Sequence, residues 1–467
     1  MTAKEEHQLE QGGETSRPVS AREWSRRRKN ITTWVVSLFK FISGLTSTSV
    51  VPNLPAISAQ FHTQGALAIF PLSTYFLGYA AGLLLIGPLS ETFGRVGALQ
   101  LSNLSFIVFN TAAGFAQTNT QIIVLRVLSG FGGAGPLSLG GGILNDCFTP
   151  EERTSLITVY ALPGQLSPAL GPILGAVCDQ FLDWRWTFWI VSITSVALQA
   201  LCFLTVRETY QPVLDRRWEK QQKGGQAQWW PSKEELADTR RKLAINTQRP
   251  FKMLATHHIV QLIALSNGLT YGIQMLVTAS LDQLWKESYH QPTILAALNY
   301  LALGVGLVFG AQVCRRCNRS IYARLKERNG GQGRPEFRVP MIAAGTVIVP
   351  LGLLWYGWAA QARVFPLVPD LGVFLLAIGL VAILNCTSLY LVDTYKLQSA
   401  SATGAVNLLR SLAGFAFPLF STALYDRLGQ GYANTLLAGI TIVAGWPVPF
   451  LLWRYGEVMR RRLIEDY

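Results

Sequence analysis

The sequence has few charged residues for its length. Asp, Glu, Lys and Arg make up 14% of the 467 residues, whereas 50% are hydrophobic. Soluble proteins carry about 25% charged residues because water must solvate most of their surface. The composition therefore excludes an ordinary soluble globular fold and predicts a chain whose main solvent is lipid.

Motifs of several other protein classes are absent. Without a Walker A sequence the chain cannot by itself be an ATP-driven pump, and no Ser-His-Asp set, HExxH pattern or paired mid-membrane carboxylate supports an enzyme. The six cysteines are scattered, which argues against a disulfide framework. Cys314-x-x-Cys317 lacks a second ligand pair, so neither a metal site nor another cofactor is expected. The formal charge of +13 falls between apolar runs rather than on amphipathic basic stretches, which argues against a nucleic-acid partner.

Long apolar runs recur along nearly the whole chain. Since about 20 residues cross the hydrocarbon core, they predict an all-α membrane protein with twelve transmembrane helices in two six-helix bundles. The predicted spans are 31–52, 66–89, 97–117, 121–144, 154–178, 186–206, 258–281, 292–313, 339–359, 366–393, 396–424 and 430–454. The implied units are an N-terminal tail (1–30), a first bundle (31–206), a polar central loop (207–257), a second bundle (258–456) and a C-terminal tail (457–467).

The basic residues predict the orientation. With both termini in the cytosol, 33 of the 40 Lys and Arg residues fall in cytosolic segments. Lys and Arg accumulate on that side because they resist translocation. We therefore predict a multi-pass protein with both tails in the cytosol.

A charged loop follows the second predicted span. Gly87 and Gly94 permit a tight turn, and Glu91 and Arg95 are close enough in sequence for an ion pair. The fourth span begins near Arg126 and ends near Asp146, roughly 30 Å further along a helix. Asp146 can thus reach the loop that contains Arg95, whereas Arg126 cannot.

These segments resemble signatures of the major facilitator superfamily, specifically its fungal twelve-span drug:proton antiporter branch. The signature G-x-L-x-D-R-x-G-R is matched at Gly87, Leu89, Glu91, Gly94 and Arg95, and R-x-x-x-G at Arg126 and Gly130. The antiporter motif is matched at Ser167, Gly171, Pro172, Gly175 and Ala176. Further similar segments are DWRWTFWI (183–190), RETY (207–210), RPEFRVP (334–340), YLVDTY (390–395) and LRSLAGFAFPLF (409–420).

The resemblance implies a central cavity between two bundles that rock to alternate access. It also implies that Gly87, Glu91, Gly94, Arg95 and Asp146 form a cytoplasmic gating cluster. The helix with Ser167, Gly171, Pro172 and Gly175 would line the bundle interface. The equivalent loop of the second half, 310–319, lacks the acid and the second glycine, so only the first-half cluster is expected to be intact.

Three cations lie within predicted spans, namely Lys40, Arg126 and Arg410. A charge at that depth costs several kcal/mol unless it faces a partner or a water-filled cavity. All three are therefore cavity candidates, although a helix-tying arginine bonded to carbonyls is the alternative for Arg126 in particular. The polar residues Gln165, Asn267 and Asn385 are further cavity candidates, with bonding to a neighbouring helix as their alternative.

All 27 Asp and Glu residues fall in tails, loops or span ends. Exporters of lipophilic cations need an acid to neutralise the cargo, so neutral or anionic substrates are expected. Lys40 or the cluster of Glu91 and Asp146 would then serve proton coupling, with the proton gradient as the driving force.

The favoured interpretation is a secondary exporter of a small, hydrophobic, neutral or weakly acidic metabolite or toxin. Multidrug efflux and proton-coupled uptake are the alternatives, and a non-transporting membrane sensor is a remote one. The expected partners are the substrate and the lipid bilayer, and the chain is expected to act as a monomer. The plasma membrane is the expected location, ahead of the vacuolar membrane.

Overall fold

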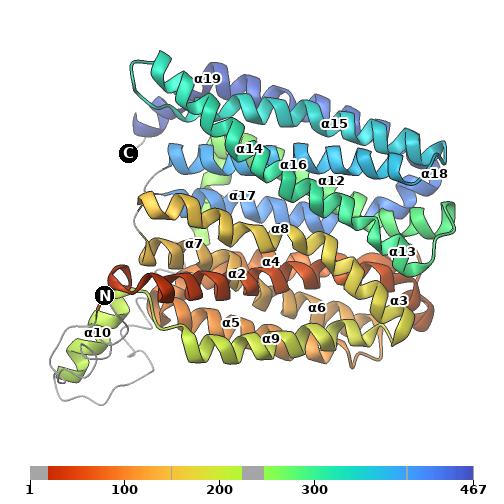
Figure 1. Cartoon of the computed structure of the whole chain (residues 1–467), viewed down its shortest axis with the longest axis horizontal. Coiled ribbons are helices and arrows are strands. Elements are labelled where there is room, and N and C mark those ends of the chain that lie inside the picture. Colours follow the sequence, from red (N-terminus) through yellow and green to blue (C-terminus); the bar gives the residue numbers. More distant parts are fainter. Residues whose placement is uncertain (1–18, 149, 223–246, 396–397, 466–467) are drawn as a thin grey trace.

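The computed structural model describes residues 19–148, 150–222, 247–395 and 398–465. Within these ranges every regular element is a helix, which confirms the predicted all-α class. The helices run roughly parallel to one long axis. The start of α2 (Arg26–Ser49), the end of α19 (Pro447–Glu465) and α10 (Gln211–Gln222) lie at the same end of the bundle (Figure 1). We call this the terminal end, and the opposite end, near α3 (Leu54–Phe61) and α13 (Thr293–Leu298), the distal end.

The first half of the chain forms one group of long helices, drawn red to yellow-green in Figure 1. They are α2 (Arg26–Ser49), α4 (Ala66–Phe93), α5 (Arg95–Ala113), α6 (Asn119–Gly133) with α7 (Gly135–Cys147), α8 (Pro150–Phe181) and α9 (Arg185–Thr205). The predicted span 121–144 is thus divided in two near Ala134. Pro136 stands in the first turn of α7, where the missing amide proton of proline costs no helix hydrogen bond.

The second half forms the other group, drawn green to blue. It contains α12 (His258–Gln283), α14 (Tyr300–Arg328), α15 (Val339–Gln361), α16 (Leu367–Thr394), α17 (Ser399–Ala416), α18 (Ser421–Gly445) and α19 (Pro447–Glu465). A kink in α18 falls at Gly429, whose φ of 71° is a left-handed value that glycine adopts without steric cost. This kink lies between the predicted spans 396–424 and 430–454.

Ten helical runs among the described residues are long and apolar enough to cross a membrane. The last run, Ser399–Arg460, has 62 residues, enough for two crossings at about 20 residues each. Together with α8, a helix of 32 residues, this agrees with twelve crossings.

Glycines allow close approach of helices within the first half. A Cβ atom at Gly78 or Gly82 of α4 would overlap the backbone carbonyl of Val127 or Phe131 in α6. This Gly-x-x-x-Gly pair therefore allows the backbones of α4 and α6 to approach closely. The two halves meet where α4 contacts α17 and where α8 contacts α13 and α14.

Candidate functional site

Two half-buried cations from opposite halves lie near each other in the middle of the bundle. Lys40 is on α2 and Arg410 is on α17, and their charges are close enough to repel each other. The ammonium of Lys40 lies 4.4 Å from the centre of the Tyr160 ring, and the Arg410 guanidinium lies 4.6 Å from the centre of the Tyr271 ring. Each cation therefore faces the negative face of an aromatic ring, and neither has an acid partner among the described residues.

Tyrosines surround this pair of cations, and we call the whole group the central cation cluster. Its members are Lys40, Tyr75, Tyr79, Tyr160, Tyr271 and Arg410. The Tyr75 and Tyr79 rings lie 6.0 Å apart, and Phe76 between them in sequence contacts Tyr271 of the second half at 5.9 Å. The cluster thus combines positive charge, phenol hydroxyls and aromatic faces at the junction of the two halves.

Arg126 touches the cluster only at Tyr75, whose ring centre lies 4.6 Å from its guanidinium, and its polar groups bond elsewhere. Its Nε donates to the Pro71 carbonyl at 2.8 Å and an Nη donates to the Thr46 carbonyl at 3.2 Å, and the residue is 0% exposed. Arg126 therefore ties α6 to α4 and α2, which is the helix-tying alternative rather than the cavity position. The physical reason is that these prolyl and threonyl carbonyls accept the guanidinium protons in place of water.

The three amide candidates also differ in burial and in whether their polar groups are already bonded. Asn267 is buried, and its Oδ1 accepts a hydrogen bond from Thr387 at 2.9 Å, which joins α12 to α16. Gln165 and Asn385 are half-buried. Of the three, Gln165 and Asn385 retain exposed surface for a ligand, whereas Asn267 has a structural partner.

The antiporter-motif face of α8 packs against α2. A Cβ atom at Gly171 would overlap the Thr48 hydroxyl, and one at Gly175 would overlap the Ser49 carbonyl. Pro172 and Ser167 are buried in the same region. The opposite side of α8 reaches the second half, where Ala169 contacts Gly304 of α14. Helix α8 therefore carries contacts both within the first half and between the halves.

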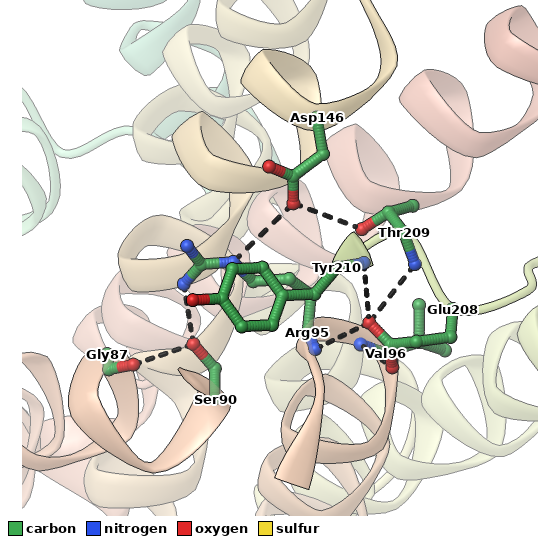
Figure 2. A network of polar contacts seen from close by, with 8 residues as sticks. All are labelled: Gly87, Ser90, Arg95, Val96, Asp146, Glu208, Thr209 and Tyr210. Atoms are coloured by element: carbon green, nitrogen blue, oxygen red, sulfur yellow. Dashed lines mark hydrogen bonds and ion pairs between the residues drawn. The ribbon is translucent and has the colours of Figure 1, made fainter. Parts of the chain in front are cut away.

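A polar network at the terminal end joins three helices of the first half (Figure 2). The Arg95 Nε lies 3.6 Å from Asp146 Oδ2, and an Nη donates to Ser90 Oγ at 2.6 Å. Ser90 in turn donates to the Gly87 carbonyl at 2.6 Å. The Arg95 guanidinium also lies over the Tyr210 ring at 4.9 Å. The predicted residues Gly87, Arg95 and Asp146 are thus brought together.

Glu208, in the RETY segment, is the acid that binds the start of α5. Its carboxylate accepts the backbone N–H groups of Arg95 and Val96 at 2.8 and 3.2 Å (Figure 2). A negative charge is favourable there because the free N–H groups and the helix dipole point at it. Gly94 has a φ of 95°, and a Cβ atom there would overlap the Glu208 carboxylate.

Glu91, the acid expected in this network, is placed differently. Its backbone carbonyl accepts a bond from Arg216 of α10 at 3.1 Å, and its carboxylate has no ion pair with a described side chain. Glu208 could not be assigned to this network from the sequence, because it is more than 110 residues away along the chain from Arg95. The signal was the RETY segment, to which no role was assigned.

Known proteins are similar to this chain in both sequence and fold. The family model for the Major Facilitator Superfamily matches residues 36–418. The chain belongs to the major facilitator superfamily. It is 36% identical to efflux pump vrtL of Penicillium aethiopicum, over 95% of this chain and 88% of that protein. It is 34% identical to a probable efflux pump, mfs2, of Aspergillus flavus, over 90% of this chain and all of that one.

Comparison with solved structures supports the same fold at low sequence identity. The xylose transporter XylE from E. coli, in a partially occluded inward-open conformation, superposes with a TM-score of 0.66 at 15% identity. The match covers 92% of this chain and 98% of XylE. Members of this superfamily are transporters, so the chain is a multi-pass membrane transporter and not an enzyme.

The second half of this superfamily member carries a charge network that the sequence argument did not expect. Arg338 Nε lies 3.1 Å from Asp393 Oδ2, and the Arg338 guanidinium lies over the Tyr322 ring at 4.2 Å. Arg460 pairs with Glu336 at 2.8 Å. The expectation that only the first half has such a network was therefore wrong.

The two networks occupy equivalent positions. Arg338 immediately precedes α15 and Asp393 lies at the end of α16, as Arg95 begins α5 and Asp146 lies at the end of α7. The acid missing from loop 310–319 is supplied by the YLVDTY segment, and the cation by RPEFRVP. A comparison of loops alone could not find a pair that is contributed by other segments.

Proposed function

We propose that this chain is a secondary exporter of a small, hydrophobic, neutral or weakly acidic metabolite. The central cation cluster is the observation that carries the proposal. Lys40 and Arg410 come from opposite halves and repel each other, so a carboxylate or phenolate between them would neutralise both charges. The surrounding tyrosines offer aromatic faces to the rest of such a molecule. The hydroxyls of Tyr79 and Tyr271 would supply polar contacts, since those of Tyr75 and Tyr160 already donate to the Ser43 and Pro136 carbonyls.

The distribution of Asp and Glu residues also favours a neutral or anionic substrate. Each described Asp or Glu of the bundle lies near a helix end or outside the long helices, except Glu457 of α19, which pairs with Arg334. No carboxylate among them therefore faces the cluster. A lipophilic cation placed there would meet two like charges without a counter-charge. Organic cations are therefore poor substrates in this proposal.

The transport cycle in this proposal is a rocking motion of the two halves about the cluster. The terminal end faces the cytosol, because the Lys and Arg residues of the loops gather at that end. The proton gradient across the plasma membrane drives export. The similarity to vrtL, an efflux pump, and to mfs2, a probable efflux pump, supports the outward direction.

An export assay tests the proposal. A strain that lacks the gene, and the same strain with the gene restored, are loaded with a panel of aromatic acids, neutral aromatic metabolites and the cation tetraphenylphosphonium. We expect the restored strain to retain less of at least one acid or neutral compound, and this difference to disappear with a proton uncoupler. Equal intracellular levels for the whole panel, or export of the cation alone, would contradict the proposal.

A further inference from the structure

Lys286 joins the two halves at the distal end. It lies in the π-helical turn η3 (Leu284–Ser288) that follows α12 of the second half. Its ammonium lies 3.9 Å from Asp179 Oδ2 on α8 and donates to the Pro52 carbonyl at 3.4 Å, in the short helix η2 (Val51–Asn53). Asp179 and Pro52 both belong to the first half. One side chain of the second half therefore binds two separate segments of the first half.

Asp282 holds the Lys286 side chain in its observed orientation. It lies one helical turn before Lys286, and its Oδ2 is 3.0 Å from the ammonium. The residue is 4% exposed, and its Oδ1 has no hydrogen-bond partner among the described residues. A lysine has a long flexible side chain that would otherwise extend into water. Asp282 thus acts as a positioning residue that holds the ammonium at the junction.

The surroundings strengthen these contacts. The side chains of Lys286 and Asp179 are 23% and 24% exposed, so water screens the pair less than it screens an ion pair on an open surface. The same junction contains the contacts of α8 with α13 and of α12 with η2. Any motion that separates the halves at the distal end must break the bonds from Lys286 to Asp179 and Pro52, whereas the bond to Asp282 moves with its own helix.

We propose that Lys286, Asp179 and Asp282 form a distal latch that stabilises the state closed at this end. The latch opens each time the substrate site becomes accessible from the distal side. The proposal rests on the rocking motion in the proposed function but not on the nature of the substrate. Its test is therefore made without substrate, and its failure would leave the exporter proposal unaffected.

The test measures the separation of the halves at the distal end. Spin labels are attached to Gln64→Cys, in the loop before α4, and Arg363→Cys, in the loop before α16, after replacement of the native cysteines. Both positions are exposed and belong to different halves. Distance distributions between the labels are then recorded by pulsed electron paramagnetic resonance on the full-length protein in lipid nanodiscs.

Two neutralising variants break the latch, namely Asp179→Asn and Lys286→Gln. We expect each to raise the ratio of distal-open to distal-closed protein by roughly threefold, the effect of losing one partly buried ion pair. Asp282→Asn should change the ratio in the same direction, and Lys286→Arg should retain the parental distribution. Asp183→Asn is the matched control, because Asp183 lies at the same end but pairs with Arg185 of its own half.

Two results would overturn the latch. One is a parental distance distribution for both Asp179→Asn and Lys286→Gln. The other is an equal shift for Asp183→Asn, which would indicate a general effect of charge at this end. If Lys286→Gln does not fold, Asp179→Asn decides alone, since it keeps the shape of a half-buried side chain.

Discussion

Replacement of Lys40 by methionine separates the charge of the central cation cluster from its shape. Lys40 extends from α2 along Gly164 of α8 and ends over the Tyr160 ring. Methionine fills the unbranched stem but carries no charge. We expect this variant to bind an anionic substrate less tightly and to bind a neutral analogue of the same shape unchanged.

The magnitude follows from the position of the charge. Two opposite charges about 4 Å apart attract each other by roughly 4 kcal/mol at an effective dielectric constant of about 20. Desolvation of the half-buried lysine and of the anion offsets more than half of this attraction. A net loss of about 1.4 kcal/mol remains, which corresponds to a roughly tenfold weaker affinity for the anion.

The same Lys40→Met substitution should stabilise the substrate-free protein. Without substrate, Lys40 and Arg410 repel each other with no acid between them. Lys40→Met removes this repulsion and the cost of a charge within the membrane. We therefore expect the substrate-free variant to unfold at a higher temperature than the wild type, and to gain less stability when the anion is added.

Thermal unfolding in detergent, with and without salicylate and its neutral amide, measures both effects. Lys40→Arg keeps the charge and should keep the selectivity for the acid. Lys29→Gln is a matched control on the same helix, about 16 Å closer to the terminal end, where Lys29 lies near Phe148. Equal loss of affinity for the acid and the amide, or a loss in Lys29→Gln as large as that in Lys40→Met, would refute the role of the Lys40 charge.

Three further predictions concern the framework. Arg126→Ala removes the two hydrogen bonds that join α6 to α4 and α2, and should lower the free energy of unfolding by about 2 kcal/mol in denaturant titrations; an unchanged transition would contradict the helix-tying role. Glu208→Gln should cost about 1–2 kcal/mol by the same measurement, whereas Glu91→Gln should cost less than about 0.5; equal costs would contradict the special role of Glu208 at the start of α5. Gly175→Ala places a methyl group into the α2 backbone and should reduce the yield of folded protein, whereas Gly141→Ala, with open space around it, should not.

The polar network around Arg95 and Asp146 shows which contacts can be predicted from the sequence and which cannot. Arg95 and Asp146 were predicted to meet because a helix of known rise places them at the same level, and they lie 3.6 Å apart. Glu208 was not predicted, since neither spacing nor periodicity relates it to α5. Its role depends on the path by which the chain after α9 returns to the start of α5. The packing of the helices determines that path.

For the three cations within spans, the sequence likewise predicts depth but not side-chain direction. Their depth along the helices could be counted from the sequence, and the cost of burying a charge made all three candidates for a cavity. Depth does not determine the direction in which a side chain points. Arg126 turns toward carbonyls of α4 and α2, whereas Lys40 and Arg410 turn toward tyrosines at the junction of the halves.

The lipid solvent, the all-α class and the predicted twelve crossings of this transporter can be read from the sequence alone. Those properties follow from the length and hydrophobicity of local runs, because lipid requires each crossing segment to satisfy its own backbone hydrogen bonds. The pairing of charged groups depends instead on how the helices pack, as it does for Glu208 with α5, Arg338 with Asp393, and Lys286 with Asp179. Such pairs join segments far apart in the chain, and their attraction acts only after packing has brought the charges within a few ångströms of each other.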